Sequence, residues 1–131
     1  MIILDTCILI HDALTPAKLT PVAKRAIKQA EGANQLFCCD ISLWEIAMLM
    51  QKKRLDVNIG IEEFLNTILE SRQIQVLAIN PEIAAVSVSS TDFKHFDPSD
   101  RLIAATTIHY NAKLITCDGH LQKVNGLSVI W

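Results

Sequence analysis

The 131-residue chain is half apolar, 20% charged and nearly neutral, with 12 Lys and Arg against 14 Asp and Glu. This composition, with only 4 Gly and 4 Pro, excludes disordered and fibrous polypeptides, and the length suits one domain, residues 1–131, that buries roughly two-thirds of its unfolded surface. The chain reaches Asp5 without a secretion-signal pattern and has no apolar run near the ~20 residues of a membrane span, so we expect a cytoplasmic protein with no membrane association.

Short apolar runs alternate with amphipathic segments along the chain. In chain order, the pattern predicts a strand at 1–5, a helix at 20–31, a strand at 35–40, helices at 42–54 and 61–72, a strand at 74–79, helices at 81–88 and 99–111, and strands at 112–118 and 127–131. Thr20 and Pro21 have the residue types of an N-cap and a first helical position. Apolar strands that alternate with helices predict an α/β fold with a parallel sheet covered on both faces.

The cysteines do not form a metal-binding or disulfide pattern. Cys38 and Cys39 are adjacent in a predicted strand, so their side chains point to opposite faces and are not expected to bridge each other. Cys7 and Cys117 also lie in apolar segments, and no CxxC spacing is present, which argues against a zinc site. We expect reduced and mostly buried thiols, as is usual in the cytoplasm.

Four acidic residues fall where a parallel sheet collects ligands. Asp5 and Asp118 each follow a predicted strand, and right-handed crossovers place the carboxyl ends of such strands on one edge of the sheet. Ligands of open α/β sheets bind beyond that edge. Glu45 and Asp100 lie near the starts of predicted helices that open onto the same edge. The sequence therefore predicts that these four side chains converge.

Each acid also has a purely structural interpretation. Ser42 and Glu45 match a capping box, in which Ser is the N-cap and Glu the third helical residue. Asp97, Pro98 and Asp100 match an N-cap and the first and third helical positions. Caps contribute roughly 0.5–2 kcal/mol each, which is a sufficient reason for either motif. Considered one at a time, these acids favour a structural role.

Considered together, the four acids point to a bound cation. Two carboxylates about 5 Å apart repel each other by ~3 kcal/mol at an effective dielectric of 20. Several such pairs would consume much of a net stability of roughly 5–15 kcal/mol, and no Lys or Arg is an obvious internal partner. Raised pKa values or a cation are therefore expected, and carboxylate oxygens favour Mg²⁺ or Mn²⁺ over zinc or copper. Such a cation can activate water and orient a phosphodiester.

Four segments of the chain carry these acids: "ILDTCILI", "DISLWEIAMLMQKKRL", "DPSDRLIAATT" and "LITCD". In this order and spacing they resemble the PIN-domain ribonucleases, and especially the VapC-type toxins of bacterial and archaeal toxin–antitoxin pairs. The similarity covers essentially the whole chain. Each segment is a weak signal alone, whereas the combination is specific, and "DPSDRLIAATT" is the most specific of the four.

The resemblance implies a PIN-like three-layer α/β sandwich whose five-stranded parallel sheet has the order 3-2-1-4-5. It implies a catalytic quartet around Mg²⁺ or Mn²⁺, formed by Asp5, Glu45, Asp100 and Asp118. Thr116 and, as a weaker candidate, Thr6 would support these acids by hydrogen bonding. The implied activity is endoribonuclease cleavage of single-stranded RNA by metal-activated water. A cognate antitoxin and a homodimer are the expected protein partners.

The chain departs from the family pattern in two places. Cys7 stands where a small polar residue such as Asn or Ser is common. After Asp118, the residues "GHL" lack an aromatic that is often found there. The acidic quartet is complete, so neither departure argues against activity.

Functions of another class stay open. A response-regulator receiver also gathers acids at the carboxyl edge of a five-stranded sheet, but here the first strand ends in the single Asp5 and no Lys follows the last strand. A PIN-like scaffold that binds metal without turnover would keep the same acids. A haloacid-dehalogenase phosphatase is disfavoured, because "DTC" lacks the second Asp of the nucleophile motif of that family.

Overall fold

The computed structural model describes residues 1–131 and contains five strands and six α-helices. The strands are β1 (Ile2–Leu4), β2 (Leu36–Cys39), β3 (Gln75–Leu77), β4 (Lys113–Ile115) and β5 (Ser128–Ile130). The α-helices are α1 (Thr6–Leu14), α2 (Pro21–Gly32), α3 (Asp40–Gln51), α4 (Ile61–Ser71), α5 (Pro81–Ser89) and α6 (Pro98–His109). Short 3₁₀ helices occur at Pro16–Lys18, Thr91–Phe93 and Leu121–Lys123.

The five strands form one parallel sheet in the order β3-β2-β1-β4-β5. β1 is central, and Leu4 lies opposite Cys38 of β2 and Ile115 of β4. This order confirms the fold expected from the sequence. Strand order reverses at β1, so the carboxyl ends of β1 and β4 lie side by side at the switch point, where α/β sheets bind ligands.

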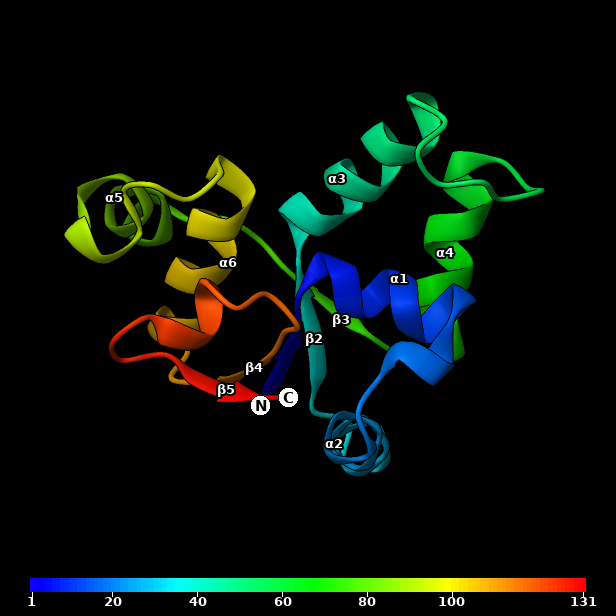
Figure 1. Ribbon diagram of the computed structural model, residues 1–131, viewed down its shortest axis with the longest axis horizontal. Coiled ribbons are helices and arrows are strands. Elements are labelled where there is room, and N and C mark those ends of the chain that lie inside the picture. Colours follow the sequence, from blue (N-terminus) through cyan, green and yellow to red (C-terminus); the bar gives the residue numbers. More distant parts are fainter.

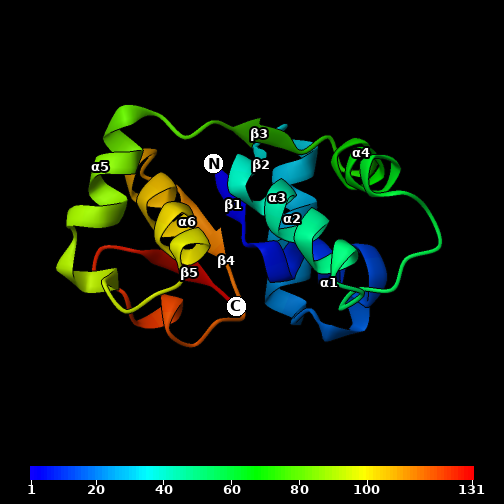
Figure 2. The same ribbon diagram turned by 90° about the horizontal axis from the view of Figure 1, so that it is seen from above.

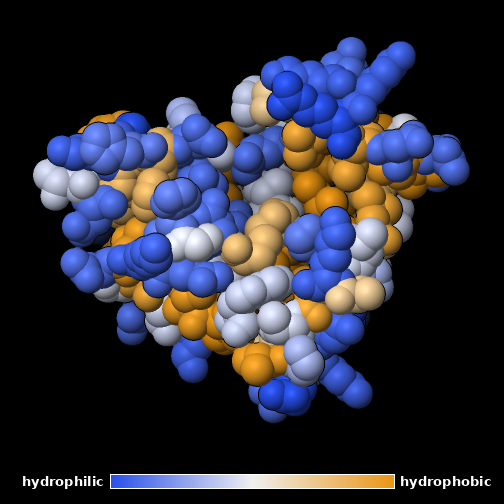
Figure 3. Space-filling model, in the orientation of Figure 1, coloured by the Kyte–Doolittle hydropathy of each residue, from blue (hydrophilic) through white to orange (hydrophobic).

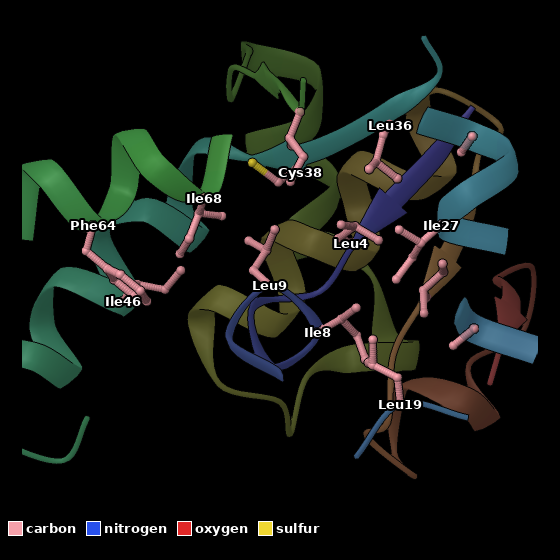
Figure 4. Close-up of a cluster of buried hydrophobic side chains, with 14 residues drawn as sticks. Leu4, Ile8, Leu9, Leu19, Ile27, Leu36, Cys38, Ile46, Phe64 and Ile68 are labelled. Carbon is pink, nitrogen blue, oxygen red and sulfur yellow. The ribbon is translucent and has the colours of Figure 1, made fainter. Parts of the chain in front are cut away.

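Both faces of the sheet are buried at its central strands β1, β2 and β4, whereas the edge strands β3 and β5 are partly exposed. Successive residues of β1 belong to different hydrophobic clusters, Leu4 to one and Ile3 to the other. Figure 4 shows the larger cluster, in which Leu4 lies between Ile27 of α2 and Leu9 of α1. The smaller cluster includes Ile103 of α6. Figures 1 and 2 accordingly place α5 and α6 on one side of the sheet and α1, α2 and α4 on the other.

The cysteine predictions are confirmed for the strand pair. Cys38 belongs to the larger cluster and Cys39 to the smaller one, so the two side chains lie on opposite faces of β2. All four cysteines are free thiols. Cys38 and Cys39 are buried, whereas Cys7 and Cys117 are only half-buried.

Helix α1 was not predicted from the sequence. It follows β1 without a connecting loop, because the side chain of Asp5 caps it by accepting a hydrogen bond from the Thr6 amide at 2.7 Å. Ile8 and Leu9 are both buried against the sheet. The apolar run that continues from β1 through Ile10 concealed the change from strand to helix, because buried strands and buried helices have similar apolar composition.

The capping box predicted at Ser42 is wrong. Helix α3 begins at Asp40, directly after β2, with Cys39 at the N-cap position and no side-chain cap bond. Ser42 is fully buried within the first turn, where its hydroxyl lies 2.9 Å from the Thr6 hydroxyl. The residue types that suit a cap therefore serve a tertiary contact between α1 and α3.

Arg72, at the end of α4, forms ion pairs with residues of two other helices. The Arg72 guanidinium donates to both carboxylate oxygens of Asp12, at 2.5 and 2.9 Å, and to Glu31 at 2.9 Å. Asp12 lies on α1 and Glu31 on α2. These hydrogen bonds raise the pKa of Arg72. These ion pairs hold the helices that cover one face of the sheet in a fixed arrangement.

The longest helices, α2, α3 and α6, have 12 residues each, and no helix has the length and apolar character needed to cross a membrane.

Candidate active site

A pocket of about 280 Å³ opens beyond the carboxyl ends of β1 and β4. It is lined by the four predicted acids, Asp5, Glu45, Asp100 and Asp118. Five other residues complete the lining: Thr6, Cys7, Ile10, Leu49 and Cys117. The acids come from four different elements or loops, and α3 and α6, which carry two of them, pack against each other. Figure 1 shows these two helices beyond the ends of the central strands. The structure therefore brings together the side chains that the sequence predicted to converge.

Asp5 is the most constrained acid of the site. It is only 4% exposed, and besides capping α1 it accepts hydrogen bonds from the Thr116 hydroxyl at 2.6 Å and the Cys7 thiol at 3.4 Å. Burial raises the pKa of Asp5, and these hydrogen bonds to its carboxylate oppose the effect. The carboxylate orientation is consequently fixed from three directions.

Thr116 connects the two acids that follow strands. Its side chain is fully buried, and its hydroxyl donates to Asp5 while it accepts from the Asp118 amide at 3.0 Å. The Asp118 carboxylate accepts from the amides of His120 and Leu121 through one oxygen, at 2.7 and 3.2 Å. Its other oxygen accepts no hydrogen bond from the protein, and Asp118 lines the pocket.

Glu45 is held by one residue from each side of the pocket. The Thr6 hydroxyl of α1 donates to one carboxylate oxygen at 2.5 Å, and the Ser99 hydroxyl of α6 donates to the other at 2.8 Å. Ser99 was not singled out from the sequence, although it stands inside the "DPSD" motif. Its role depends on Glu45, 54 positions earlier in the chain, so no local pattern identifies it.

Asp100 differs from the other acids because its environment offers only burial and negative charge. These raise its pKa to about 7, with burial as the largest cause, followed by the charges of Asp5, Asp118, Glu45 and Asp97. Asp97 occupies the N-cap position of α6 as predicted, but its side chain makes no cap hydrogen bond. The first turn of α6 therefore positions Asp100 at the pocket.

The residues of the pocket fit a hydrated divalent cation. Four carboxylates line it and no Lys, Arg or His does. Burial first, and then the charges of the neighbouring acids, raise the pKa of Asp100, and a bound cation would offset those charges. No three acidic, His or Cys side chains are gathered closely enough to hold a metal ion directly. Mg²⁺ retains several of its waters in proteins, so carboxylates spaced around a pocket suit it better than a closed metal cage.

Fold and pocket together define an α/β protein with a carboxylate-lined site at the switch point of its sheet. The family model of the PIN domain matches residues 2–127. Ribonuclease VapC22 of Mycobacterium tuberculosis is 31% identical over 122 residues, which are 93% of this chain and 90% of that protein. The chain belongs to the PIN domain family.

Solved structures show the same fold at low sequence identity. VapBC2 from Rickettsia felis, bound to a DNA fragment from its promoter, matches with a TM-score of 0.75 and 18% identity, over 98% of this chain and 97% of that one. A toxin–antitoxin complex from Klebsiella pneumoniae matches with a TM-score of 0.65 and 20% identity, over 97% of this chain and 95% of that one.

Proposed function

We propose that this protein is a Mg²⁺- or Mn²⁺-dependent endoribonuclease that cleaves single-stranded RNA and acts as the toxin of a toxin–antitoxin pair. The observation that carries the proposal is the pocket in which Asp5, Glu45, Asp100 and Asp118 meet without a cationic side chain. Family membership and the relative named as a ribonuclease support it.

In this proposal one or two of the four carboxylates bind the cation directly and the others hold it through its waters. When bound, the cation supplies a water of lowered pKa and neutralises charge on a phosphodiester. The chain's own residues set the geometry. Thr116 and the Thr6 amide fix the orientation of Asp5, and Thr6 and Ser99 fix Glu45. Burial and the neighbouring acids raise the pKa of Asp100 to about 7 in the metal-free protein, so binding of the cation is expected to displace a proton from this carboxyl.

A protein partner is part of the proposal. The two solved structures described above are toxin–antitoxin assemblies. This chain exposes large apolar side chains, among them Trp44 and Ile59, that a partner would cover. Figure 3 shows a hydrophobic area between α3 and α4. A cavity of about 590 Å³ in this region is lined by Met50, Leu55, Val57, Ile59 and Ile61, among others. We propose this area for the antitoxin, and we expect a homodimer through another face.

The decisive experiment compares acid-to-amide variants of the site. Asp5→Asn and Asp100→Asn should each lower the rate of RNA cleavage by at least ~100-fold in Mg²⁺ or Mn²⁺, because each removes a charge that would hold the cation. Asp92→Asn is the matched control, since Asp92 is exposed and does not line the pocket. Sequencing RNA 5′ ends after induced expression of the parent and of Asp100→Asn measures the same effect in cells.

The outcomes separate the candidate functions. Equal cleavage by the parent and Asp100→Asn would refute the mechanism. Metal binding without cleavage by the parent would instead favour a PIN-like scaffold. Phosphorylation by acetyl phosphate would favour the receiver-like alternative, although no Lys lines the pocket to pair with a phosphoryl group.

A further inference from the structure

Two thiols meet beside the acidic pocket, although they stand 110 positions apart in the sequence. Cys7 lies in the first turn of α1, just after β1, and Cys117 follows β4. Their sulfur atoms are 2.9 Å apart, which is closer than two non-bonded sulfurs normally approach. Both side chains are half-buried and line the pocket, so a small solute that enters it reaches them.

The two sulfurs lie close to the separation of a disulfide, and the strands that precede them are paired neighbours. A disulfide requires a sulfur–sulfur bond of about 2.05 Å and α-carbons roughly 4.4–6.8 Å apart. β1 and β4 are adjacent paired strands, which lie ~4.8 Å apart, and Cys7 and Cys117 follow their ends by a few residues. The sulfurs therefore need to approach by only ~0.9 Å to reach bonding distance.

The other two cysteines are neither accessible nor close to another sulfur. Cys38 and Cys39 are buried, lie on opposite faces of β2 and have no sulfur partner in the fold. They provide a control within the same molecule. A reagent that reaches only accessible thiols of the folded protein should leave Cys38 and Cys39 unmodified, whereas a reagent that acts after unfolding should modify them too.

We propose that Cys7 and Cys117 are an oxidative modification site, at which hydrogen peroxide converts the two thiols into an intramolecular disulfide. The Cys7 thiol donates its hydrogen to Asp5, which leaves Cys117 as the donor in the contact between the sulfurs. We assign Cys117 as the first nucleophile. It attacks one peroxide oxygen, the oxygen–oxygen bond breaks, and the departing hydroxide takes the thiol proton as water, leaving a sulfenic acid.

The second step closes the bridge. The Cys7 sulfur attacks the Cys117 sulfur, the sulfur–oxygen bond breaks, and hydroxide leaves with the Cys7 proton as a second water. The two thiols are oxidised by two electrons and one peroxide is reduced to two waters. A dithiol reverses the reaction by exchange.

The bridge would alter the surroundings of two of the acids. It joins the segments that carry Asp5 and Asp118, and it removes the thiol hydrogen bond to Asp5. It also closes a loop of roughly 110 residues, which restrains the unfolded chain. Bond formation is independent of RNA cleavage, so its test does not depend on the proposed function.

The test treats the folded full-length protein with hydrogen peroxide, blocks free thiols by alkylation and maps peptides by mass spectrometry without reduction. We expect a linked pair of peptides containing Cys7 and Cys117, with Cys38 and Cys39 still free. The midpoint of thermal unfolding should rise by roughly 5–15 °C and return after treatment with a dithiol.

Cys7→Ser and Cys117→Ser should each abolish the linked peptide and the peroxide-dependent rise in midpoint, while circular dichroism reports whether each variant is folded. The peptide map of the parent decides the question even if a variant fails to fold. Oxidation that yields only intermolecular bridges, only sulfinic acid, or links to Cys38 or Cys39 would overturn the proposal.

Discussion

Burial raises the pKa of two aspartates of the pocket, but the two side chains differ in their hydrogen bonds. Asp5 accepts hydrogen bonds from Thr6, Thr116 and Cys7, which favour its charged form. Asp100 has burial and neighbouring negative charges, which raise its pKa to about 7. Asp5 is therefore held in one orientation, whereas Asp100 changes its protonation state near neutral pH in the metal-free protein.

The first prediction concerns the stability of the metal-free protein. Because the folded-state pKa of Asp100 is about 7, the folded protein holds a proton between pH ~4 and ~7 that the unfolded chain has released. The free energy of unfolding should therefore fall as the pH rises through this window and then level off. Asp100→Asn should reduce this slope and stabilise the protein at pH 8 by about 1–2 kcal/mol, a value discounted for partial exposure.

Urea denaturation in the presence of a chelator measures this effect at pH 5, 6, 7 and 8. The exposed Asp92→Asn variant is the control and should keep the slope of the parent. If Asp100→Asn showed the same pH dependence as the parent, the charge interactions assigned to Asp100 would be incorrect.

At the scale of elements, the helices around the larger cluster are joined by Arg72. This residue follows α4 and pairs with Asp12 of α1 and Glu31 of α2, 60 and 41 positions earlier in the chain. A guanidinium that donates two parallel hydrogen bonds to one carboxylate fixes geometry as well as contributing energy. Helix α1 also carries Thr6 in its first turn and Asp5 at its N-cap. The ion pairs of Arg72 therefore help to fix the helix that positions these two residues of the site.

The second prediction is that Arg72→Met lowers the free energy of unfolding by about 1–3 kcal/mol, because it leaves Asp12 and Glu31 without their partner. Arg54→Met is the matched control, since Arg54 is exposed and makes no ion pair, and it should change stability by less than ~0.5 kcal/mol. Urea denaturation at pH 7 measures both. Equal effects of the two substitutions would show that the ion pairs of Arg72 contribute nothing specific.

For the whole molecule, the proposed cation couples binding to folding. A ligand that binds only the folded state stabilises it by about 2.7 kcal/mol at a concentration 100 times its dissociation constant. The carboxylates come from separate parts of the chain, so the unfolded protein has no comparable site.

The third prediction is that Mn²⁺ raises the midpoint of thermal unfolding and that this rise diminishes below pH ~7, because protons compete with the cation for Asp100. Differential scanning calorimetry across a Mn²⁺ series at pH 6 and pH 8 measures the effect. The rise should be lost in Asp100→Asn and kept in Asp92→Asn. An increase of the same size at both pH values would contradict this assignment.

The sequence by itself determined the five strands and every α-helix except α1, the sheet order through the family resemblance, and which four acids meet. Buried faces can be recognised from the local sequence, because apolar residues recur with the period of the strand or helix to which they belong. An acid that follows a strand is likewise visible locally, as Asp5 and Asp118 show.

Only the tertiary structure decided what surrounds each of these residues. Helix α1, the placement of Ser42 within α3, the Ser99 contact to Glu45 and the meeting of Cys7 with Cys117 all depend on packing between distant segments. A side-chain environment is set by distances in space, and the two thiols stand 110 positions apart in the chain. The sequence therefore predicts which residues reach the pocket, and the packing of α1, α3 and α6 decides their hydrogen bonds and charges.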